Sequence, residues 1–517
     1  MHIVGREKQI VIPLPADHGD VIGSGIIEIY ANTLMTHRNV NTKSFTGTWK
    51  IMNGPHEGNY GGAGLFLGGT YLYNAKELII GGAWMSNKER RLGANVQTGW
   101  HNGYQYGATT NEWKNVFPSH IILDGGRLQL LNEGPLGGAS YNAYVATGIR
   151  EDYLETDTLE ISSGPMGSLV SKVAKHHPGT YPNVTSTITN LVVRKGGSVA
   201  FDINTIDNAG SAYPLLTNSM YVVNSPEGVW TSPDGSYQVL QFFSKNIEAE
   251  THSIAIRDTA TGKISLTNSV TTRGSSGNFR VIDKWDNPKE ESFPDGTEFI
   301  SLSLYQERKV VFSEPNATIK ILSGYLTMPH NSEFGKLDDP NTESGTLDFG
   351  EITGYVYSSF QNNSPAKIGC RIVGSNGLVK SAGGKLELYQ PLDQLSGGVY
   401  VNCGSLIMKN AATFGENDVY VYAGGKVSIT GQNPFNTRAT LYLEERDWLP
   451  CYSKLDLATS EEVKVGKLMV NGASVPRGTY GSSLSNAEFV DDNLFEGTGV
   501  IKVLSDDCLQ PTIILMK

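Results

Sequence analysis

The sequence predicts an all-β protein, built as a right-handed single-stranded parallel β-helix (β-solenoid) with long loop insertions in its N-terminal half. Glycines recur directly before short stretches of alternating apolar residues, the pattern of a half-buried strand entered from a tight turn. In the C-terminal part these stretches recur about every 20 residues, a repeat length typical of solenoids. Almost no segment has the apolar periodicity of a helix.

Residues 1–320 are expected to form irregular β-helix turns with long, aromatic-rich functional loops. Alternating strands begin at Gly25 (GIIEI), Gly69 (GTYLY), Gly126 (GRLQL) and Gly197 (GSVAF), and the later gaps of 57 and 71 residues predict excursions from the scaffold. The unusual side chains lie in these excursions, at 53–62, 86–91, 98–107, 111–115 and 172–183. Loops on a rigid scaffold commonly carry function, so we look for an activity there.

Residues 321–435 are expected to form regular turns of about 20 residues each. The strands begin at Gly324 (GYLTM), Gly345 (GTLDF), Gly384 (GKLEL), Gly404 (GSLIM) and Gly425 (GKVSI), in steps of 21, 39, 20 and 21 residues. The long step predicts a degenerate copy near 368–369. Residues 436–517 are expected to form the last turns and a cap, with closing strands in 461–483 and 495–507.

The composition excludes several function classes. A net charge of −11 and a pI near 5.5 argue against a nucleic-acid partner. The glycine-rich 61–64 segment lacks the Lys and Ser/Thr of a phosphate loop, so no nucleotide is expected. No apolar stretch has the length for membrane insertion. We expect no cofactor and no metal, because the four cysteines show no CxxC spacing; buried thiols and disulfides are both open for Cys370, Cys403, Cys451 and Cys508.

The segment 372–431 resembles the autotransporter-associated β-strand repeat, also called the passenger-associated transport repeat. It has a Gly-Leu-Val-Lys opening, a Gly-Gly strand, a Ser-Gly-Gly-Val strand, a Gly-Ser-Leu strand and then Ala-Thr-Phe-Gly. The Leu-x-Val-Asn-Gly and Gly-Thr-Tyr elements after 461 are similar to the ending of such arrays. The resemblance implies a secreted bacterial β-helix, extracellular or on the cell surface, and supplies no catalytic motif. The charged N-terminus is no signal peptide, so we expect a removed targeting segment or a start within a longer protein.

A first candidate catalytic group lies in 172–183. Lys175, His176 and Tyr181, with His177 beside them, are the most concentrated titratable donors in the sequence. A polysaccharide lyase needs a base and a cation that neutralises a uronate carboxylate, and these residue types supply both. An ordinary exposed polar loop explains the same residues.

A second candidate group lies in 280–286. Asp283 and Asp286 would act as acid and base, and Trp285 would stack on an apolar sugar face; Arg280 and Lys284 belong to the same candidate catalytic cluster. The alternative is a turn, in which Asp side chains bond to the backbone.

Aromatic residues in the long loops form a candidate substrate-binding surface. The residues are Trp100, His101, Tyr104, Tyr106 and Trp113. The alternative is that they anchor the loops to the scaffold by burying area.

Two functions from different classes remain. The first is a secreted enzyme that cleaves an extracellular polysaccharide or other glycan, as glycoside hydrolase or polysaccharide lyase. The second is a non-catalytic adhesin or structural passenger module. The long polar loops favour the first, and the repeat family favours the second.

Overall fold

The computed structural model of the chain describes residues 2–5, 21–31, 35–36, 44–53, 64–66, 72, 74–82, 95–98, 117–132, 155–173, 186–204, 221–227, 229–246, 251–267, 279–282, 289–337, 345–358, 364–409, 412–444 and 453–505. These residues form strands and turns, with no helix among them. The chain divides into two compact units, 1–276 with 447–450 and 277–446 with 451–517. No helix suited to crossing a membrane occurs in the described ranges.

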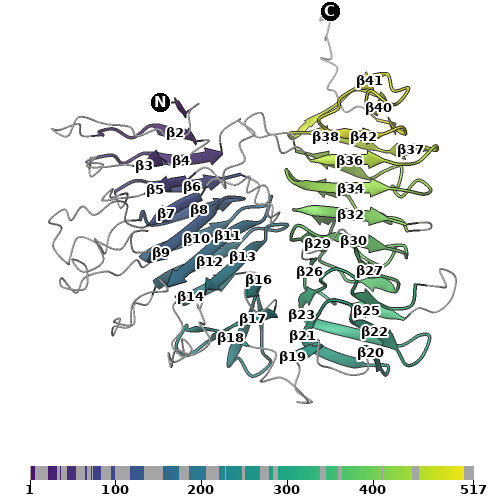
Figure 1. Cartoon of the computed structure of the whole chain (residues 1–517), viewed down its shortest axis with the longest axis horizontal. Helices are drawn as coiled ribbons and strands as arrows, with labels where there is room; N and C mark the ends of the chain where they lie inside the picture. Colours follow the sequence, from purple (N-terminus) through teal and green to yellow (C-terminus); the bar gives the residue numbers. More distant parts are fainter. Residues whose placement is uncertain are drawn as a thin grey trace, which may run out of the picture. The chain divides into compact units, whose positions relative to one another are not determined.

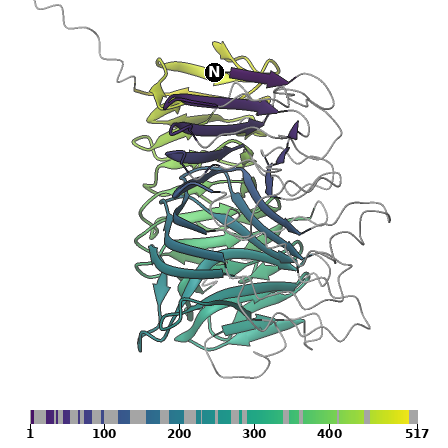
Figure 2. The ribbon, with the colours of Figure 1, turned by 90° about the vertical axis from the view of Figure 1, so that its left-hand side faces the viewer.

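Unit 1 contains a first sheet in which every neighbouring pair is parallel. Its strands, in spatial order, are β1 (His2–Gly5), β2 (Ile26–Ala31), β4 (Thr48–Asn53), β6 (Glu77–Gly81), β8 (His120–Asp124), β10 (Glu155–Ile161), β12 (Ser186–Val193) and β14 (Tyr221–Glu227). Figure 2 shows the first of these strands, in purple, stacked one on another.

A second sheet of unit 1 takes the strands that alternate with those of the first. It runs through β3 (Met35–Thr36), β5 (Gly64–Phe66), β7 (Asn95–Thr98), β9 (Arg127–Asn132), β11 (Gly167–Val173), β13 (Val199–Asn204) and β16 (Tyr237–Asn246), all parallel. It then ends in antiparallel pairings with β15 (Trp230–Thr231), β17 (Thr251–Asp258) and β18 (Ile264–Thr267). The chain therefore passes back and forth between two parallel sheets.

The core of unit 1 follows from the period-2 alternation of its strands. In the first sheet the register stacks one buried apolar residue per strand, in the order Ile27, Trp49, Leu78, Ile121, Leu159 and Leu191. The residues on either side in sequence point outward. Gly125, which precedes the predicted GRLQL strand, has φ +80°, and a Cβ there would overlap the carbonyl oxygen of Gly82. Glycine is required at this turn because the backbones approach so closely.

Unit 2 contains a third sheet. Its parallel path is β19 (Phe279–Ile282), β21 (Thr297–Leu304), β23 (Thr318–Thr327), β26 (Gly354–Tyr357), β29 (Leu378–Ser381), β31 (Val399–Val401), β33 (Val419–Val421), β35 (Thr440–Leu443) and β38 (Lys467–Val470), and β39 (Ala473–Ser474) follows antiparallel. The first half of β23 pairs with β25 (Thr346–Asp348), which pairs with β28 (Arg371–Val373).

The fourth sheet is parallel throughout and takes the alternating strands of unit 2. They are β20 (Glu290–Phe293), β22 (Lys309–Phe312), β24 (Glu333–Phe334), β27 (Ala366–Ile368), β30 (Lys385–Leu388), β32 (Gly404–Met408), β34 (Gly425–Ile429), β36 (Lys454–Leu457) and β42 (Phe495–Gly497). Figure 1 shows β30, β32, β34 and β36 as successive arrows. A small fifth sheet joins β37 (Glu462–Val465), β43 (Val500–Val503), β40 (Gly478–Gly481) and β41 (Phe489–Val490).

Only some of the strands predicted from the glycine repeat are successive strands of the fourth sheet. The strands after Gly384, Gly404 and Gly425 are the successive neighbours β30, β32 and β34, in register. The strands at Gly324 and Gly345 belong to the third sheet instead. The degenerate copy expected near 368–369 corresponds to β27, which pairs with β24 on one side and with β30 on the other. The Gly345-to-Gly384 step thus joins strands of different sheets.

Two sequence predictions bear on boundaries and thiols. Along the chain, the main boundary between the units falls at 276/277. The divisions expected at 320/321 and 435/436 concern the regularity of the repeat and stay predictions. Cys370 and Cys403 are both buried, and Cys370 is a free thiol. Cys451 and Cys508 lie outside the described residues.

Candidate functional site

Among the described residues of unit 1, a histidine and two glutamates form a polar group on the outer face of the first sheet. The buried residues Leu78, Ile121 and Leu159 pair across β6, β8 and β10. Because side chains alternate along a strand, Glu77, His120 and Glu160 next to them point away from the core. Three strands that are far apart in the sequence thus bring a histidine and two carboxylates together.

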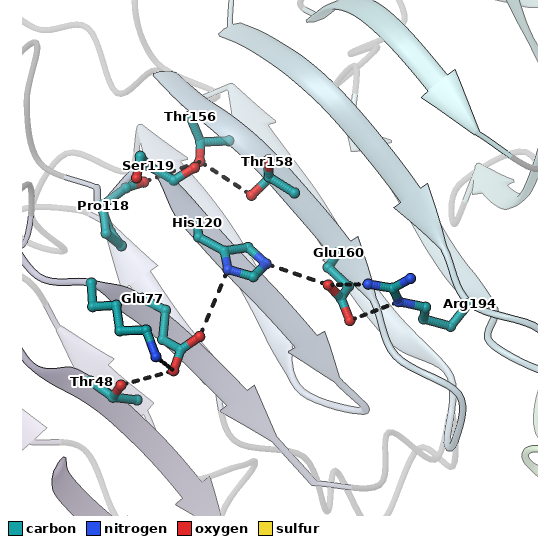
Figure 3. Close-up of polar contacts among 10 residues, drawn as sticks. Thr48, Glu77, Pro118, Ser119, His120, Thr156, Thr158, Glu160 and Arg194 are labelled. Atoms are coloured by element: carbon teal, nitrogen blue, oxygen red, sulfur yellow. Dashed lines mark hydrogen bonds and ion pairs between the residues drawn. The ribbon is translucent and has the colours of Figure 1, made fainter.

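His120 lies between the two carboxylates (Figure 3). Its Nδ1 is 3.7 Å from Oε2 of Glu77, and its Nε2 is 3.4 Å from Oε2 of Glu160. The His120 side chain is 33% exposed and each glutamate side chain is 17% exposed. The ring is therefore partly exposed, but its Nε2 atom is buried and makes no hydrogen bond, and the carboxylates are more shielded than the ring.

Neighbouring side chains hold both carboxylates in place. Arg194 donates from Nε and Nη2 to the two Glu160 oxygens at 3.1 and 3.0 Å, a bidentate pair. This hydrogen bonding lowers the pKa of the Glu160 carboxyl below its usual value, so Glu160 is ionised near neutral pH. The Thr48 hydroxyl donates to Oε1 of Glu77 at 2.8 Å, and Lys76 Nζ lies 3.8 Å from the same oxygen. Each glutamate thus has one oxygen directed at His120 and further partners behind it.

The start of β8 is fixed by a buried hydroxyl. Thr156, 4% exposed, donates to the carbonyl oxygens of Pro118 and Ser119 at 3.1 and 2.9 Å. These two residues directly precede His120, so the hydroxyl limits movement of the backbone that carries the imidazole (Figure 3). Thr156 therefore holds the backbone that carries the ring, and the flanking carboxylates lie at the ring itself.

The arrangement suits proton transfer. Imidazole is the side chain whose charge ordinarily changes between pH 5 and 8. The carboxylates contact different nitrogens of one ring, so the width of the ring separates them. The imidazole itself occupies the space between the two carboxylates. No group of three His, Cys, Asp or Glu in the described ranges is arranged to hold a metal ion.

Arg280 is the one predicted site residue within the described part of the chain. It lies on β19 and forms an ion pair with Glu291 of β20, with 20% and 17% of the two side chains exposed. Its guanidinium is thus engaged by a carboxylate of the neighbouring strand. The other predicted site residues lie outside the described residues: Trp100, His101, Tyr104, Tyr106, Trp113, Lys175, His176, Tyr181, Asp283, Trp285 and Asp286.

Sequence reasoning did not find the His120 group. Each member stands beside an apolar alternation, in KELII, HIILD and DTLEI, and that alternation shows only that the residue faces outward. The members are 43 and 40 residues apart along the chain, and the intervening segments differ in length. Because register is decided by pairing across strands, the sequence contains no direct sign that they meet.

Unit 2 presents a column of stacked tyrosines. Tyr400, Tyr420 and Tyr442 occupy matching positions on β31, β33 and β35. Their ring centroids are 4.7 and 4.3 Å apart, with interplanar angles of 10° and 5°. The ring faces contact each other, so the faces that would stack on a sugar are occupied within the column. We interpret the column as a stabilising cross-strand contact.

The outer face of the fourth sheet has alternating charges. Glu333 lies between Lys309 and Lys367, with N–O distances of 2.6 and 3.4 Å, and Lys426 lies 3.1 Å from Asp456. Each charge thus has an opposite charge on a neighbouring strand. Such partly exposed pairs contribute little individually, typically under about 1 kcal/mol.

No protein-family model, no curated protein and no solved structure matches this chain.

Proposed function

We propose that both units are right-handed single-stranded parallel β-helices of the autotransporter-associated repeat type. The support is the regular alternation of successive strands between two parallel sheets in each unit. Right-handed connection is the rule for parallel strands of one sheet. By the same resemblance the protein is extracellular or attached to a bacterial cell surface.

We propose further that the protein acts on an extracellular polysaccharide, as a glycoside hydrolase. The single observation that carries this proposal is the His120 imidazole held between the Glu77 and Glu160 carboxylates on an exposed sheet face. A flat face with strands about 4.8 Å apart suits an extended chain of sugar units. His120 is the proton-transferring residue, and Glu160, ionised through Arg194, is the partner that orients the ring.

A hydrolase is favoured over a lyase by the charges around His120. A lyase must neutralise the uronate carboxylate beside the proton that it removes. The cations beside this site, Arg194 and Lys76, both face carboxylates, at 3.0 and 3.8 Å. The substrate is therefore proposed to be a glycan without uronates.

The test is a panel of neutral glycans, uronate polymers and chitosan, assayed for reducing ends and for absorbance of unsaturated uronates. We expect reducing ends from a neutral or amino glycan and no unsaturated product. His120→Asn should lower the rate roughly 100-fold, the lower end for lost acid–base catalysis. Glu160→Gln should also lower the rate, because the ring loses its orienting partner, and Glu227→Gln is its matched control, since Glu227 is exposed and lies in the same column two strands further on. Equal rates in the His120→Asn variant and the unaltered protein would contradict the assignment.

A second candidate function is a non-catalytic adhesin or structural passenger module. It is favoured by the outer faces of unit 2, where the tyrosines stack on each other and the charges pair across strands. In that case immobilised glycan or cells would retain the protein without releasing any product. Product formation from a soluble glycan would exclude the non-catalytic reading.

A further inference from the structure

Lys380 lies inside the apolar core of unit 2. It is on β29 and pairs with Val356 of β26 and Val401 of β31, both of which are fully buried core residues. Because residues at matched positions of parallel strands point to the same side, the Lys380 side chain enters the core. Its exposure is 0%. A lysine in such a column requires a specific set of partners.

Three carbonyl oxygens surround the Lys380 nitrogen. Nζ donates to Ala382 O at 2.7 Å, to Gly384 O at 2.6 Å and to Cys403 O at 2.6 Å. An ammonium has three N–H donors, whereas a neutral amine has two. The short distances are those of charge-assisted hydrogen bonds. The geometry therefore matches an ammonium coordinated by the backbone.

The backbone of two successive turns is shaped around this nitrogen. Ala382 and Gly384 belong to the turn after β29, and Cys403 belongs to the turn after β31. Ala382 has φ +64°, a left-handed conformation that is unfavourable for a residue with a Cβ. At Gly404, φ is +68° and a Cβ would lie 2.5 Å from the Lys380 nitrogen. Both turns thus adopt conformations that leave room for Nζ and direct carbonyl groups toward it.

The dipoles of the three carbonyl groups compensate for the burial of the Lys380 charge. Burial lowers the pKa of Lys380 to about 7, and burial raises the pKa of the Cys403 thiol, which therefore stays neutral. No carboxylate acts on Lys380 among the described residues. Rings of carbonyl oxygens coordinate monovalent cations in the same way.

We propose that the carbonyl oxygens of Ala382, Gly384 and Cys403 form an internal cation site whose resident cation is the Lys380 ammonium. The site ties the turn after β29 to the turn after β31 and so joins two layers of the stack. When the side chain is shortened, the site accepts a small monovalent cation such as methylammonium, which reproduces the Cε and Nζ atoms of the lost side chain. This inference is independent of any action on polysaccharides.

The full-length protein tests the proposal through Lys380→Met, Lys380→Ala and the control Lys385→Met, which changes a half-buried lysine on β30, the next strand along the chain. Lys380→Met should lower the melting temperature of unit 2 by about 5–10 °C, since three buried carbonyl groups lose the Lys380 donor, although Gly384 O keeps another, the Ser405 amide. Hydrogen exchange should accelerate at the Ser405 amide, which bonds to Gly384 O, and Lys385→Met should change neither measurement.

Methylammonium chloride should restore part of the stability of Lys380→Ala, whereas tetramethylammonium chloride at equal ionic strength should not. Equal effects of the two salts, or a Lys380→Met variant as stable as Lys385→Met, would overturn the proposal. A measurement on the unaltered protein applies even where the variants do not fold. With ¹⁵N-labelled lysine at pH 6, one ammonium signal should be protected from solvent exchange, and its absence would equally overturn the proposal.

Discussion

Replacing Leu406 by alanine perturbs the middle of the stacked core of unit 2. Leu406 is fully buried on β32 and lies in register between Leu386 of β30 and Val427 of β34. The change removes three carbons, which at about 0.8 kcal/mol per buried CH₂ corresponds to about 2.4 kcal/mol. A cavity term is added, because neighbours on both sides hold the strand spacing and the space cannot collapse. We expect the free energy of unfolding to fall by about 3–4 kcal/mol.

Urea denaturation followed by far-ultraviolet circular dichroism measures this loss. Leu484→Ala is the matched control, since the same atoms are removed from a side chain that is 73% exposed. The control should change the unfolding free energy by less than about 0.5 kcal/mol. A loss below about 1 kcal/mol for Leu406→Ala, or equal losses for both variants, would refute the stacked-core reasoning.

Three further predictions concern other contacts. Tyr420→Ala should lower the free energy of unfolding in urea denaturation by about 2 kcal/mol, because two ring stacks are lost, and Tyr420→Phe should lower it much less. Similar losses for the two variants would show that the hydroxyl, and not the ring stacking, provides the stabilisation. The pKa of Glu160 is lower in the folded protein than in the unfolded chain. Its ion pair with Arg194 therefore stabilises the fold at pH values above the unfolded-state pKa, and this stabilisation is lost as the pH falls through the folded-state pKa. In Arg194→Gln, a carboxyl titration by NMR should show the Glu160 pKa shifted upward. Gly235→Ala should destabilise unit 1 by about 1 kcal/mol, because φ is positive there but an added Cβ would have no atom within 4 Å. Gly125→Ala should destabilise unit 1 by more than this, and thermal unfolding of the two variants measures the difference.

Much of the local structure of this chain is readable from residue patterns. The glycine-strand patterns at Gly126, Gly197, Gly384, Gly404 and Gly425 precede or open strands β9, β13, β30, β32 and β34. The all-β class is confirmed for the described residues. Alternation also identifies the buried side of each strand, because a one-residue shift would expose its apolar side chains.

The assignment of strands to sheets was less predictable. The strand at Gly345 has the same pattern as the one at Gly384, yet it joins a different sheet. A short apolar alternation identifies one strand and its two faces, but it does not specify which strand pairs with it in the sheet. Pairing depends on the lengths and conformations of the turns between strands, which vary along this chain.

The sequence by itself identified several strands, their buried faces and the need for glycine at close turns, because these depend on neighbouring residues. Tertiary structure decided which outward residues meet. His120 acquires Glu77 and Glu160 only through the register of three strands. Lys380 shows the same limit: its position in the alternation places it in the core, but the three carbonyl groups that accept its charge come from turns of two successive layers. Contacts between layers are set by stacking geometry, which a single sequence does not specify.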